Sequence, residues 1–317
     1  MTQPIVTILI PTYNRHLFLR EAVKSAVDQT YRNLEILILD DASPDATAHI
    51  AAEFSQDPRV RYIRHADNVG IAENWRVGIE TAAGEYFCLL HDDDTIEPSF
   101  IEKMLPPLRE DSNIILSFCD HWVMNEHGKR DLGLSDRASV QFKRSLLQPG
   151  RIGDWATESL VDSTVPVGAT LFRKNMVPAD FIDIRAKGAI DAWLFYRCVK
   201  TGHAAYYIQD RLMNYRLHGG GMSRSSVLYM NEGHVFRNQE ILADPNMSAL
   251  HSQIRELLSA SLAHQGVYLL KENKQNAARA ALRRSLTLHK TRRNVLAYGL
   301  ACCGPIGSTV ARVVHSG

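Results

Sequence analysis

The stretch EYFCLLHDDD at residues 85–94 joins an apolar run to three consecutive aspartates. A near-continuous apolar run is typical of a strand that is buried on both faces of a parallel sheet. Adjacent carboxylates repel one another and add nothing to the stability of a strand end. The aspartates therefore lie either on a solvated loop or around a positively charged group.

Similar apolar runs recur along the first part of the chain, and we expect further strands at residues 5–11, 34–40, 60–65 and 114–120. Helix-like segments separate them. Residues 16–29 carry apolar side chains at the helical period. A second helix is expected to begin with Ser43 as N-cap and Pro44 in the first turn, and a third to span residues 70–84 and end at Gly84. This alternation predicts an α/β fold, a mostly parallel sheet flanked by helices on both faces.

Polar residues follow four of the expected strands, at positions 12–15, 40–43, 67–70 and 91–94. In open α/β sheets, ligands bind beyond the carboxyl ends of the strands. A single acid at such an end is usually a helix cap, but four polar clusters at one edge favour a ligand site. The sequence therefore predicts a site at this edge of the sheet.

Two common ways of holding a phosphate are missing from this sequence. The first strand ends in PTYNR rather than in the glycine-rich dinucleotide motif, and no P-loop pattern occurs. A divalent cation that bridges carboxylates and phosphate oxygens is then the expected way to hold a diphosphate. The solvated-loop alternative for the three aspartates stays open on these residues alone.

Composition narrows the class of protein. The chain has 317 residues, of which 45% are hydrophobic, so it has ample core for a large α/β domain with a helical extension. Its formal net charge of +1 argues against nucleic acid as the main partner. Five cysteines without metal-type spacing fit reduced thiols, and the N-terminus shows no signal-peptide pattern. We expect a cytoplasmic protein.

Several motifs together resemble one family. They are VTILIPTYNR (6–15), EILILDDASPD (35–45), NVGIAENWRVGIETAAGEYFCLLHDDD (68–94) and DAWLFYRCVKTGHAAYYIQDRLMNYRLHGGGMS (191–223). They resemble the family 2 glycosyltransferases with a GT-A fold, of the bacterial surface-glycan type, and the resemblance covers roughly residues 4–225. It implies an inverting, metal-dependent enzyme that moves a sugar from a nucleotide-diphosphate donor, with UDP favoured, to a hydroxyl of a glycan or lipid-linked acceptor.

The resemblance also implies roles for single residues. The nucleotide pocket would be formed by Pro11, Thr12, Tyr13, Arg15, Asp40, Asp41, Asn68, Asn74, Asp92 and Asp93. Within this set, Asp41, with Asp40 beside it, would contact the base or the ribose.

The three aspartates would form the D-x-D element that holds Mg²⁺ or Mn²⁺ on the donor diphosphate. The expected metal ligands are Asp93, Asp94 and His218. Many relatives read D-x-D-D here, and this chain has His91 at the first acidic place; read literally, the motif is Asp92-x-Asp94. His91 is either a weak ligand or simply a strand-end residue, and we favour the second interpretation.

On the acceptor side, the resemblance makes Asp191 the catalytic base, because a carboxylate precedes a "WL" helix in the family. The usual Glu-Asp pair is reduced here to one acid, with Ile190 before it. A helix cap is the alternative for this aspartate. Gly168, Trp193, Arg216 and His218 would shape the acceptor and diphosphate loop. The glycines at 219–221 suit a mobile closing loop or a plain surface turn.

Residues 226–317 form a second region with a helical pattern. Eight cations lie between residues 271 and 293, against the single acid Glu272. Two alternatives stay open for this region. It lies on the cytoplasmic surface of the inner membrane, or it packs as a helical pair on the catalytic domain or in a homodimer.

Two other functions also remain open. A sugar nucleotidyltransferase needs a glycine-rich basic loop after the first strand, and PTYNRH is a poor version of that loop. A non-catalytic relative that binds nucleotide or glycan is compatible with the single acid at Asp191 and with the histidine at position 91.

Overall fold

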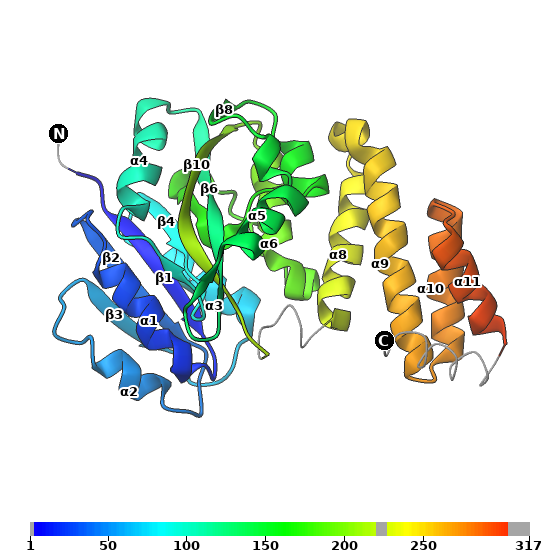
Figure 1. Cartoon of the computed structure of the whole chain (residues 1–317), viewed down its shortest axis with the longest axis horizontal. Coiled ribbons are helices and arrows are strands. Elements are labelled where there is room, and N and C mark those ends of the chain that lie inside the picture. The colour runs from blue at the N-terminus through cyan, green and yellow to red at the C-terminus, as the bar shows by residue number, and fades with distance from the viewer. Residues whose placement is uncertain (1–2, 220–226, 304–317) are drawn as a thin grey trace. The chain divides into compact units, whose positions relative to one another are not determined.

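The computed structural model describes residues 3–219 and 227–303, and the chain divides into two compact units (Figure 1). The first unit comprises Met1–Ile182 and Leu194–Gly219, and the second comprises Asp183–Trp193 and Gly220–Gly317. The expected boundary between residues 225 and 226 lies outside the described residues.

The first unit is built on one sheet. Its strands are β1 (Val6–Thr12), β2 (Leu34–Asp40), β3 (Val60–Arg64), β4 (Tyr86–Leu89), β5 (Thr95–Ile96), β6 (Ile114–Asn125), β7 (Arg130–Asp131), β8 (Gly150–Ile152), β9 (Thr170–Arg173) and β10 (Ala204–Leu217). The order is β3-β2-β1-β4-β9-β6-β10-β5, with β7 beside β6 and β8 beside β10. β1 pairs in parallel with β2 and β4, whereas β9 runs antiparallel between β4 and β6. The expected parallel core is confirmed, and the inserted antiparallel β9 is an addition to it.

Helices connect these strands. They are α1 (His16–Val27), α2 (Thr47–Ala52), α3 (Ile71–Thr81), α4 (Phe100–Glu110), α5 (Leu132–Gln141) and α6 (Ile190–Val199). Short helical turns are η1 (Arg144–Leu146), η2 (Thr157–Val161), η3 (Val167–Ala169) and η4 (Lys174–Met176). The first turn of α6 belongs to the second unit, and the rest of that helix belongs to the first.

Both faces of the sheet are covered, as the apolar runs predict. Ile8 and Ile10 of β1 share a buried cluster with Leu19 of α1. On the other face, a Cβ placed on Gly78 of α3 would lie 2.3 Å from Leu39 and 3.6 Å from Leu9. Successive residues of a strand point to opposite faces, so alternate residues of β1 pack against the helices on the two faces of the sheet.

Two expected helix ends are wrong. α2 begins at Thr47 rather than after Ser43, because the hydroxyl of Ser43 accepts a hydrogen bond (2.9 Å) from the N–H of Asn14 after β1. α3 ends at Thr81 rather than at Gly84. Gly84 instead lies in the turn that leads into β4.

A small polar network fixes the start of β4. The Thr7 hydroxyl donates to Glu35 (2.7 Å), the N–H of Ala83 donates to the same carboxylate oxygen (2.7 Å), and the N–H of Gly84 donates to the Thr7 hydroxyl (3.0 Å). These bonds connect the turn before β4 to both β1 and β2. They therefore help to fix the position of β4 along the sheet, and with it the position of the aspartates that follow its far end.

Among the described residues of the second unit, all the regular elements are helices, which confirms the expected helical C-terminal region. Its elements, besides the first turn of α6, are η5 (Ile184–Ala189), α8 (Val227–Ala243), η6 (Pro245–Leu250), α9 (His251–Lys271), α10 (Gln275–Leu288) and α11 (Arg292–Cys302). Small residues allow close packing: a Cβ on Gly266 of α9 would lie 2.4 Å from Leu282 of α10. Within the described ranges, no helix is both long enough and apolar enough to cross a bilayer.

Buried polar groups also join α9, α10 and α11. The side-chain amide of Asn294 donates to Ser285 (2.9 Å) and to the carbonyl of His289 (2.8 Å), and Ser259 and Ser285 share a hydrogen bond (2.9 Å). Asn294 is almost fully buried. Such satisfied networks fix one arrangement of the helices, since an unpaired buried amide is costly.

The tight turn before β4 gives a stability prediction. A Cβ on Gly84 would lie 2.7 Å from the backbone nitrogen and hydroxyl of Thr7 and from the carbonyl of Tyr86. Gly84→Ala should therefore lower the free energy of unfolding by about 1–3 kcal/mol, the usual cost of overpacking. Urea unfolding followed by tryptophan fluorescence measures this. In the control Gly153→Ala, the nearest atom is a side-chain tip at 3.6 Å, and equal losses in the two variants would contradict the prediction.

Candidate active site

The turn that follows β4 gathers potential metal ligands. His91, Asp93 and Asp94 each offer one donor atom, and these atoms lie within 4.8 Å of one another. Asp92 and Asp94 are buried, whereas the side chain of Asp93 is 13% exposed. The expected position at the carboxyl end of a central strand is confirmed.

Arg216 at the end of β10 anchors this turn. Its backbone N–H donates to Asp94 (2.8 Å), and its guanidinium donates to the carbonyl of Asp93 (2.8 Å), the carbonyl of Glu126 (3.0 Å) and the carboxylate of Glu21 (2.6 Å). The guanidinium carbon also lies 4.9 Å from the ring centre of Phe18. Because the Arg216 side chain is fully buried, it acts here as a structural support of the aspartates.

The guanidinium of Arg15 and the imidazole of His218 both contact Asp93. The guanidinium of Arg15 forms an ion pair with Asp93 and lies 3.5 Å from Asp92. Nε2 of His218 lies 3.0 Å from the same Asp93 oxygen that Arg15 contacts. The structure thus brings together Arg15, Asp92, Asp93 and His218, residues from the ends of three different strands.

His91 lies on the other side of the cluster. Its Nδ1 lies 3.3 Å from Oδ2 of Asp94, and its ring stacks with Trp75 of α3 at 6.3 Å between ring centres. A Cβ on Gly168 would lie 3.6 Å from Nδ1 of His91 and 3.8 Å from Oδ2 of Asp94. The same Cβ would lie 2.9 Å from the terminal methyl group of Met213, so a side chain at position 168 would crowd its neighbours.

Burial and neighbouring charges shift the pKa values of His91, Asp92, Asp93 and Asp94 in different directions. Burial disfavours the imidazolium of His91, but the hydrogen bond with Asp94 and the nearby carboxylates outweigh it and raise the pKa of His91 to about 9. Burial raises the pKa of Asp92 to about 7 and also raises the pKa of Asp94. At Asp93 burial is outweighed by His91, Arg15 and His218, so its pKa is lowered. Asp93 is therefore the carboxylate most readily ionised.

The donor set fits a divalent cation. Carboxylate oxygens suit Mg²⁺ and Mn²⁺, and imidazole nitrogens suit first-row transition metals. Asp93 and Asp94 supply oxygens, and His91 and His218 lie beside them.

The carboxylates of Asp40 and Asp41 both accept hydrogen bonds from other residues of the protein. Oδ1 of Asp40 accepts from the N–H of Ser43 (2.8 Å), and its other oxygen accepts from Tyr62 and Arg64. The carboxylate of Asp41 accepts from the N–H groups of Val69 (2.6 Å) and Gly70 (2.9 Å). Both aspartates hold the turns after β2 and β3, and their contact with a nucleotide stays a prediction.

The remaining nucleotide-side residues differ in accessibility. Tyr13 is 48% exposed, whereas Thr12 and Asn74 are buried. The Asn74 amide donates to the carbonyl of Leu39 (3.0 Å), and the Asn68 amide donates to the carbonyl of Asp41 (3.3 Å). Pro11 lies in β1. Of these residues, Tyr13 is the one whose side chain is most available to stack on a base.

Asp191 and Trp193 lie at the start of α6, as expected, and belong to the second unit. Within that unit, the charge of Asp191 acts on Arg237 and His234 of α8. Burial lowers the pKa of Arg237 to about 10, and Asp191 opposes that shift. The ring of Trp193 lies 5.2 Å from that of Phe236. The carboxylate of Asp191 therefore lies within electrostatic reach of a buried guanidinium of the same unit.

Three supporting residues were missed from the sequence. Phe18 packs against both Arg216 and His218, Glu21 pairs with Arg216, and Trp75 stacks on His91. In the sequence, Phe18 and Glu21 look like ordinary members of an amphipathic helix. Their spacing of three residues on one helical face is the only local signal, and it does not identify a partner 195 residues away.

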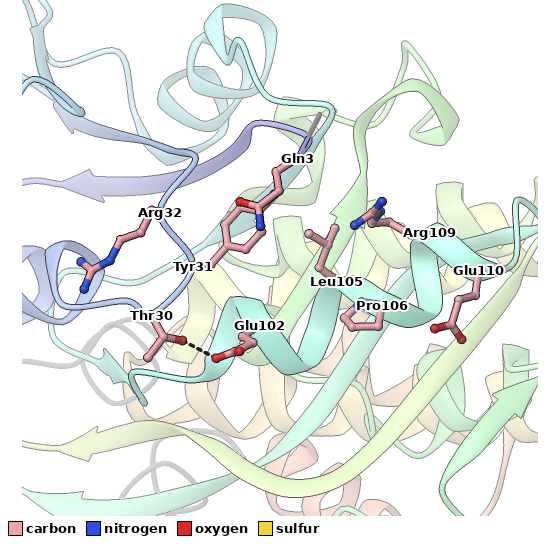
Figure 2. A pocket seen from close by; sticks show the side chains of 9 residues that line it. All are labelled: Gln3, Thr30, Tyr31, Arg32, Glu102, Leu105, Pro106, Arg109 and Glu110. Carbon is pink, nitrogen blue, oxygen red and sulfur yellow. Dashed lines mark hydrogen bonds between the residues drawn. The ribbon is translucent and has the colours of Figure 1, made fainter. Parts of the chain in front are cut away.

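A hollow of about 600 Å³ lies away from this site. Figure 2 shows its lining, which includes Tyr31, Arg32, Glu102, Arg109 and Glu110. These residues precede β2 or lie on α4, so the hollow is at the amino end of the sheet. It contains none of the residues of the acidic cluster, and the chemistry described above does not involve it.

Comparison with known proteins identifies the family. The profile described as glycosyl transferase family 2 matches residues 7–159. An uncharacterized glycosyltransferase of Haemophilus influenzae is 33% identical over 234 residues, which cover 72% of this chain and 69% of that protein. EpsH of Bacillus subtilis, named as a glycosyltransferase, is 24% identical over 96% of this chain and 85% of its own length. A glycosyltransferase of Rickettsia conorii is 30% identical over 68% of this chain, but over only 33% of its own length. The chain belongs to glycosyltransferase family 2 and is a glycosyltransferase.

Solved structures show the same fold. TarS of S. aureus in complex with UDP-GlcNAc superposes with a TM-score of 0.66 at 15% identity, covering 98% of this chain and 91% of that one. The mannosyltransferase PcManGT of Pyrobaculum calidifontis, in complex with GDP-Man and Mn²⁺, gives a TM-score of 0.59 at 15% identity, covering 99% and 87%. These similarities confirm the expected GT-A fold.

The support given by Arg216 is testable. Arg216→Met removes a buried guanidinium and leaves the carbonyls of Asp93 and Glu126 without their donor. It should lower the free energy of unfolding of the first unit by about 3 kcal/mol, which is typical of breaking a buried hydrogen-bond network. Three of the four tryptophans (Trp75, Trp122 and Trp155) lie in that unit, so urea unfolding followed by tryptophan fluorescence measures it.

The matched control for Arg216 is Arg20→Met, which removes an exposed ion pair with Glu53. Its unfolding midpoint should stay close to that of the wild type, because exposed ion pairs contribute little. A fully stable Arg216→Met variant would show that the buried guanidinium is not a support.

Proposed function

We propose that this glycosyltransferase is metal-dependent and inverting, and that it transfers a sugar from a nucleotide-diphosphate donor to a hydroxyl of a glycan or lipid-linked acceptor. The observation that carries the proposal is the cluster of His91, Asp93 and Asp94 at the carboxyl end of β4. A divalent cation held by Asp93 and Asp94, with His218 beside them, would stabilise the charge of the leaving diphosphate.

Other residues of this chain would bind the diphosphate, support the acidic turn and accept the proton. Arg15 lies at the end of β1 and carries a positive charge beside Asp93, where it would bind the diphosphate. Arg216 would hold the acidic turn in place, and Gly168 would permit its own segment to pass close to that turn. Asp191 would accept the proton of the acceptor hydroxyl as that oxygen attacks the anomeric carbon, because a neutral alcohol is a poor nucleophile. Attack opposite to the departing diphosphate inverts the anomeric configuration.

UDP is the nucleotide we favour, and surface-polysaccharide synthesis is the role we favour. TarS was solved with UDP-GlcNAc, whereas PcManGT was solved with GDP-Man. Both donors belong in the test, since the fold alone accommodates either. Two alternatives have less support: the turn after β1 lacks the glycine-rich basic loop of a nucleotidyltransferase, and a non-catalytic relative would retain nucleotide binding alone.

The deciding experiment combines donor binding with transfer. Wild-type protein should be stabilised against heat by one nucleotide sugar of a panel when Mn²⁺ or Mg²⁺ is present, because a ligand that binds the folded state stabilises it. Asp191→Asn should bind the same donor but transfer its sugar at least about a hundredfold more slowly, the loss expected for a general base. Donor hydrolysis and transfer to lipid-linked glycan are then measured for both proteins.

The control is Glu256→Gln, which removes an exposed acid from α9 of the same unit and should transfer normally. Full activity of Asp191→Asn would refute the assignment of the base. Nucleotide binding by the wild type without hydrolysis or transfer would instead favour the non-catalytic relative.

We also propose that the C-terminal helices contact the cytoplasmic face of an anionic membrane. Arg279 and Arg283 are exposed one turn apart on α10, and Arg292 and Arg293 are exposed at the start of α11. Apolar side chains lie exposed shortly after these arginines on α11, with Val295 at 51% and Leu296 at 69%. A basic helix surface beside exposed apolar groups is typical of proteins that lie on anionic lipid.

Vesicle flotation tests this contact. The intact chain should float with vesicles that contain phosphatidylglycerol and remain behind with pure phosphatidylcholine. Replacing the four arginines by glutamine should nearly abolish flotation, since each cation near an anionic surface contributes about 1 kcal/mol. Replacing Arg20, Lys24, Lys103 and Arg151 of the first unit by glutamine is the control with equal charge loss. A wild-type chain that does not float but sediments as a dimer would support the packing alternative instead.

A further inference from the structure

The ends of β1, β2 and β3 form one row at the carboxyl edge of the sheet. Thr12 of β1 lies opposite Asp40 of β2, and Asp40 lies opposite Arg64 of β3. Neighbouring strands are about 4.8 Å apart, so Arg64 lies about 10 Å along this edge from Thr12. The proposed diphosphate would lie beside Arg15, which follows β1. A nucleotide bound there can extend its base along the row toward β3.

The carboxylates in this row are already engaged by the protein. Asp40 is fully buried, and its oxygens accept hydrogen bonds from a backbone N–H, the hydroxyl of Tyr62 and the guanidinium of Arg64. Asp41 is 3% exposed, and each of its oxygens accepts from a backbone N–H of the turn after β3. An N–H group of a base would have to displace one of these donors to reach either carboxylate.

Arg64 is the exposed donor of the same row. Its side chain is 41% exposed. A guanidinium carries five N–H groups and has no acceptor. The contacts of Arg64 with Asp40, Tyr62 and the carbonyl of Ser43 leave some of these N–H groups free among the described residues. The same contacts fix the position of the guanidinium, so its free N–H groups are held ready for a ligand.

Ser43 connects this arginine to the aromatic side chain that is most available to stack on a base. The hydroxyl of Ser43 accepts from the N–H of Asn14 (2.9 Å), and its carbonyl accepts from Arg64 (2.9 Å). Asn14 directly follows Tyr13, which is 48% exposed. The turn that carries Tyr13 and the guanidinium of Arg64 are both attached to Ser43. A base stacked on Tyr13 would therefore lie near the free N–H groups of Arg64.

The bases differ in a group that a guanidinium can distinguish. Uracil has a keto oxygen where cytosine has an amino group, and guanine and adenine differ in the same way. A keto oxygen accepts a hydrogen bond from the guanidinium. An amino group is itself a donor, so it would leave the guanidinium without a partner, which weakens binding.

We propose that Arg64 recognises the base of the donor nucleotide by donating to its keto oxygen, and that the site thereby selects uracil or guanine over cytosine or adenine. The inference rests on the proposed nucleotide-diphosphate donor and adds the residue that chooses the base. Arg64 is not among the residues that the sequence resemblance places in the nucleotide pocket.

Calorimetric titration with UDP, CDP, GDP and ADP, each in the presence of Mn²⁺, measures the selection. In the wild type, the tighter of UDP and GDP should bind at least about tenfold more strongly than its amino counterpart, which is within the discrimination that a good base contact gives. In Arg64→Met this ratio should disappear, chiefly because the keto nucleotide binds more weakly. Arg64→Lys retains a donor without an acceptor and should keep part of the ratio. Because it preserves the charge beside Asp40, it also serves if Arg64→Met is unstable.

Two controls separate recognition of the base from a general effect on the row. Tyr62→Phe removes the other side-chain donor to Asp40 and leaves the guanidinium in place. Arg61→Met removes an exposed cation of the same strand, which pairs with Glu35. Both variants should keep the wild-type ratio.

The outcomes distinguish this inference from the proposed function. A ratio that persists or rises in Arg64→Met would overturn the role of Arg64 and assign the selection to the released carboxylate of Asp40. Equal binding of the keto and amino nucleotides by the wild type would overturn the inference while leaving the nucleotide donor intact. A wild-type chain that binds none of the four nucleotides would contradict the proposed donor as well.

Discussion

The buried guanidinium of Arg216 is the constraint on which the site depends. A charge taken out of water is very unfavourable unless hydrogen bonds surround it. Arg216 meets this requirement through the carbonyls of Asp93 and Glu126 and the carboxylate of Glu21. The turn after β4, the loop between β6 and β7, and α1 must therefore all converge on the end of β10. The position of the acidic turn follows from satisfying this one side chain.

The three adjacent aspartates coexist because each has different partners. Asp94 contacts His91 and accepts a hydrogen bond from the backbone N–H of Arg216. Asp93 contacts Arg15 and His218. Asp92 is buried, with the guanidinium of Arg15 3.5 Å away. The pKa of Asp93 is lowered while those of Asp92 and Asp94 are raised. The turn thus avoids carrying three full negative charges at once, which explains how a core strand can end in this way.

Most of the sheet could be predicted because a strand buried on both faces has a local signature, a continuous apolar run. The site was predictable to the same degree, since the residues after such strands meet at one edge. What failed depends on distant partners. Ser43 does not cap α2, because its hydroxyl accepts a hydrogen bond from the N–H of Asn14. The supporting roles of Phe18 and Glu21 likewise appear only when β10 is in place.

The assembly of the site has a consequence for how the protein is made. Glu21 and Arg216 are 195 residues apart, and Asp93 and His218 are 125 apart. Closing loops of this length costs conformational entropy before the contacts can compensate for it. On the ribosome, the segment that forms β1 to β4 emerges well before β10 is synthesised. A nascent chain therefore carries its three aspartates long before it carries the arginine and histidine that hold them.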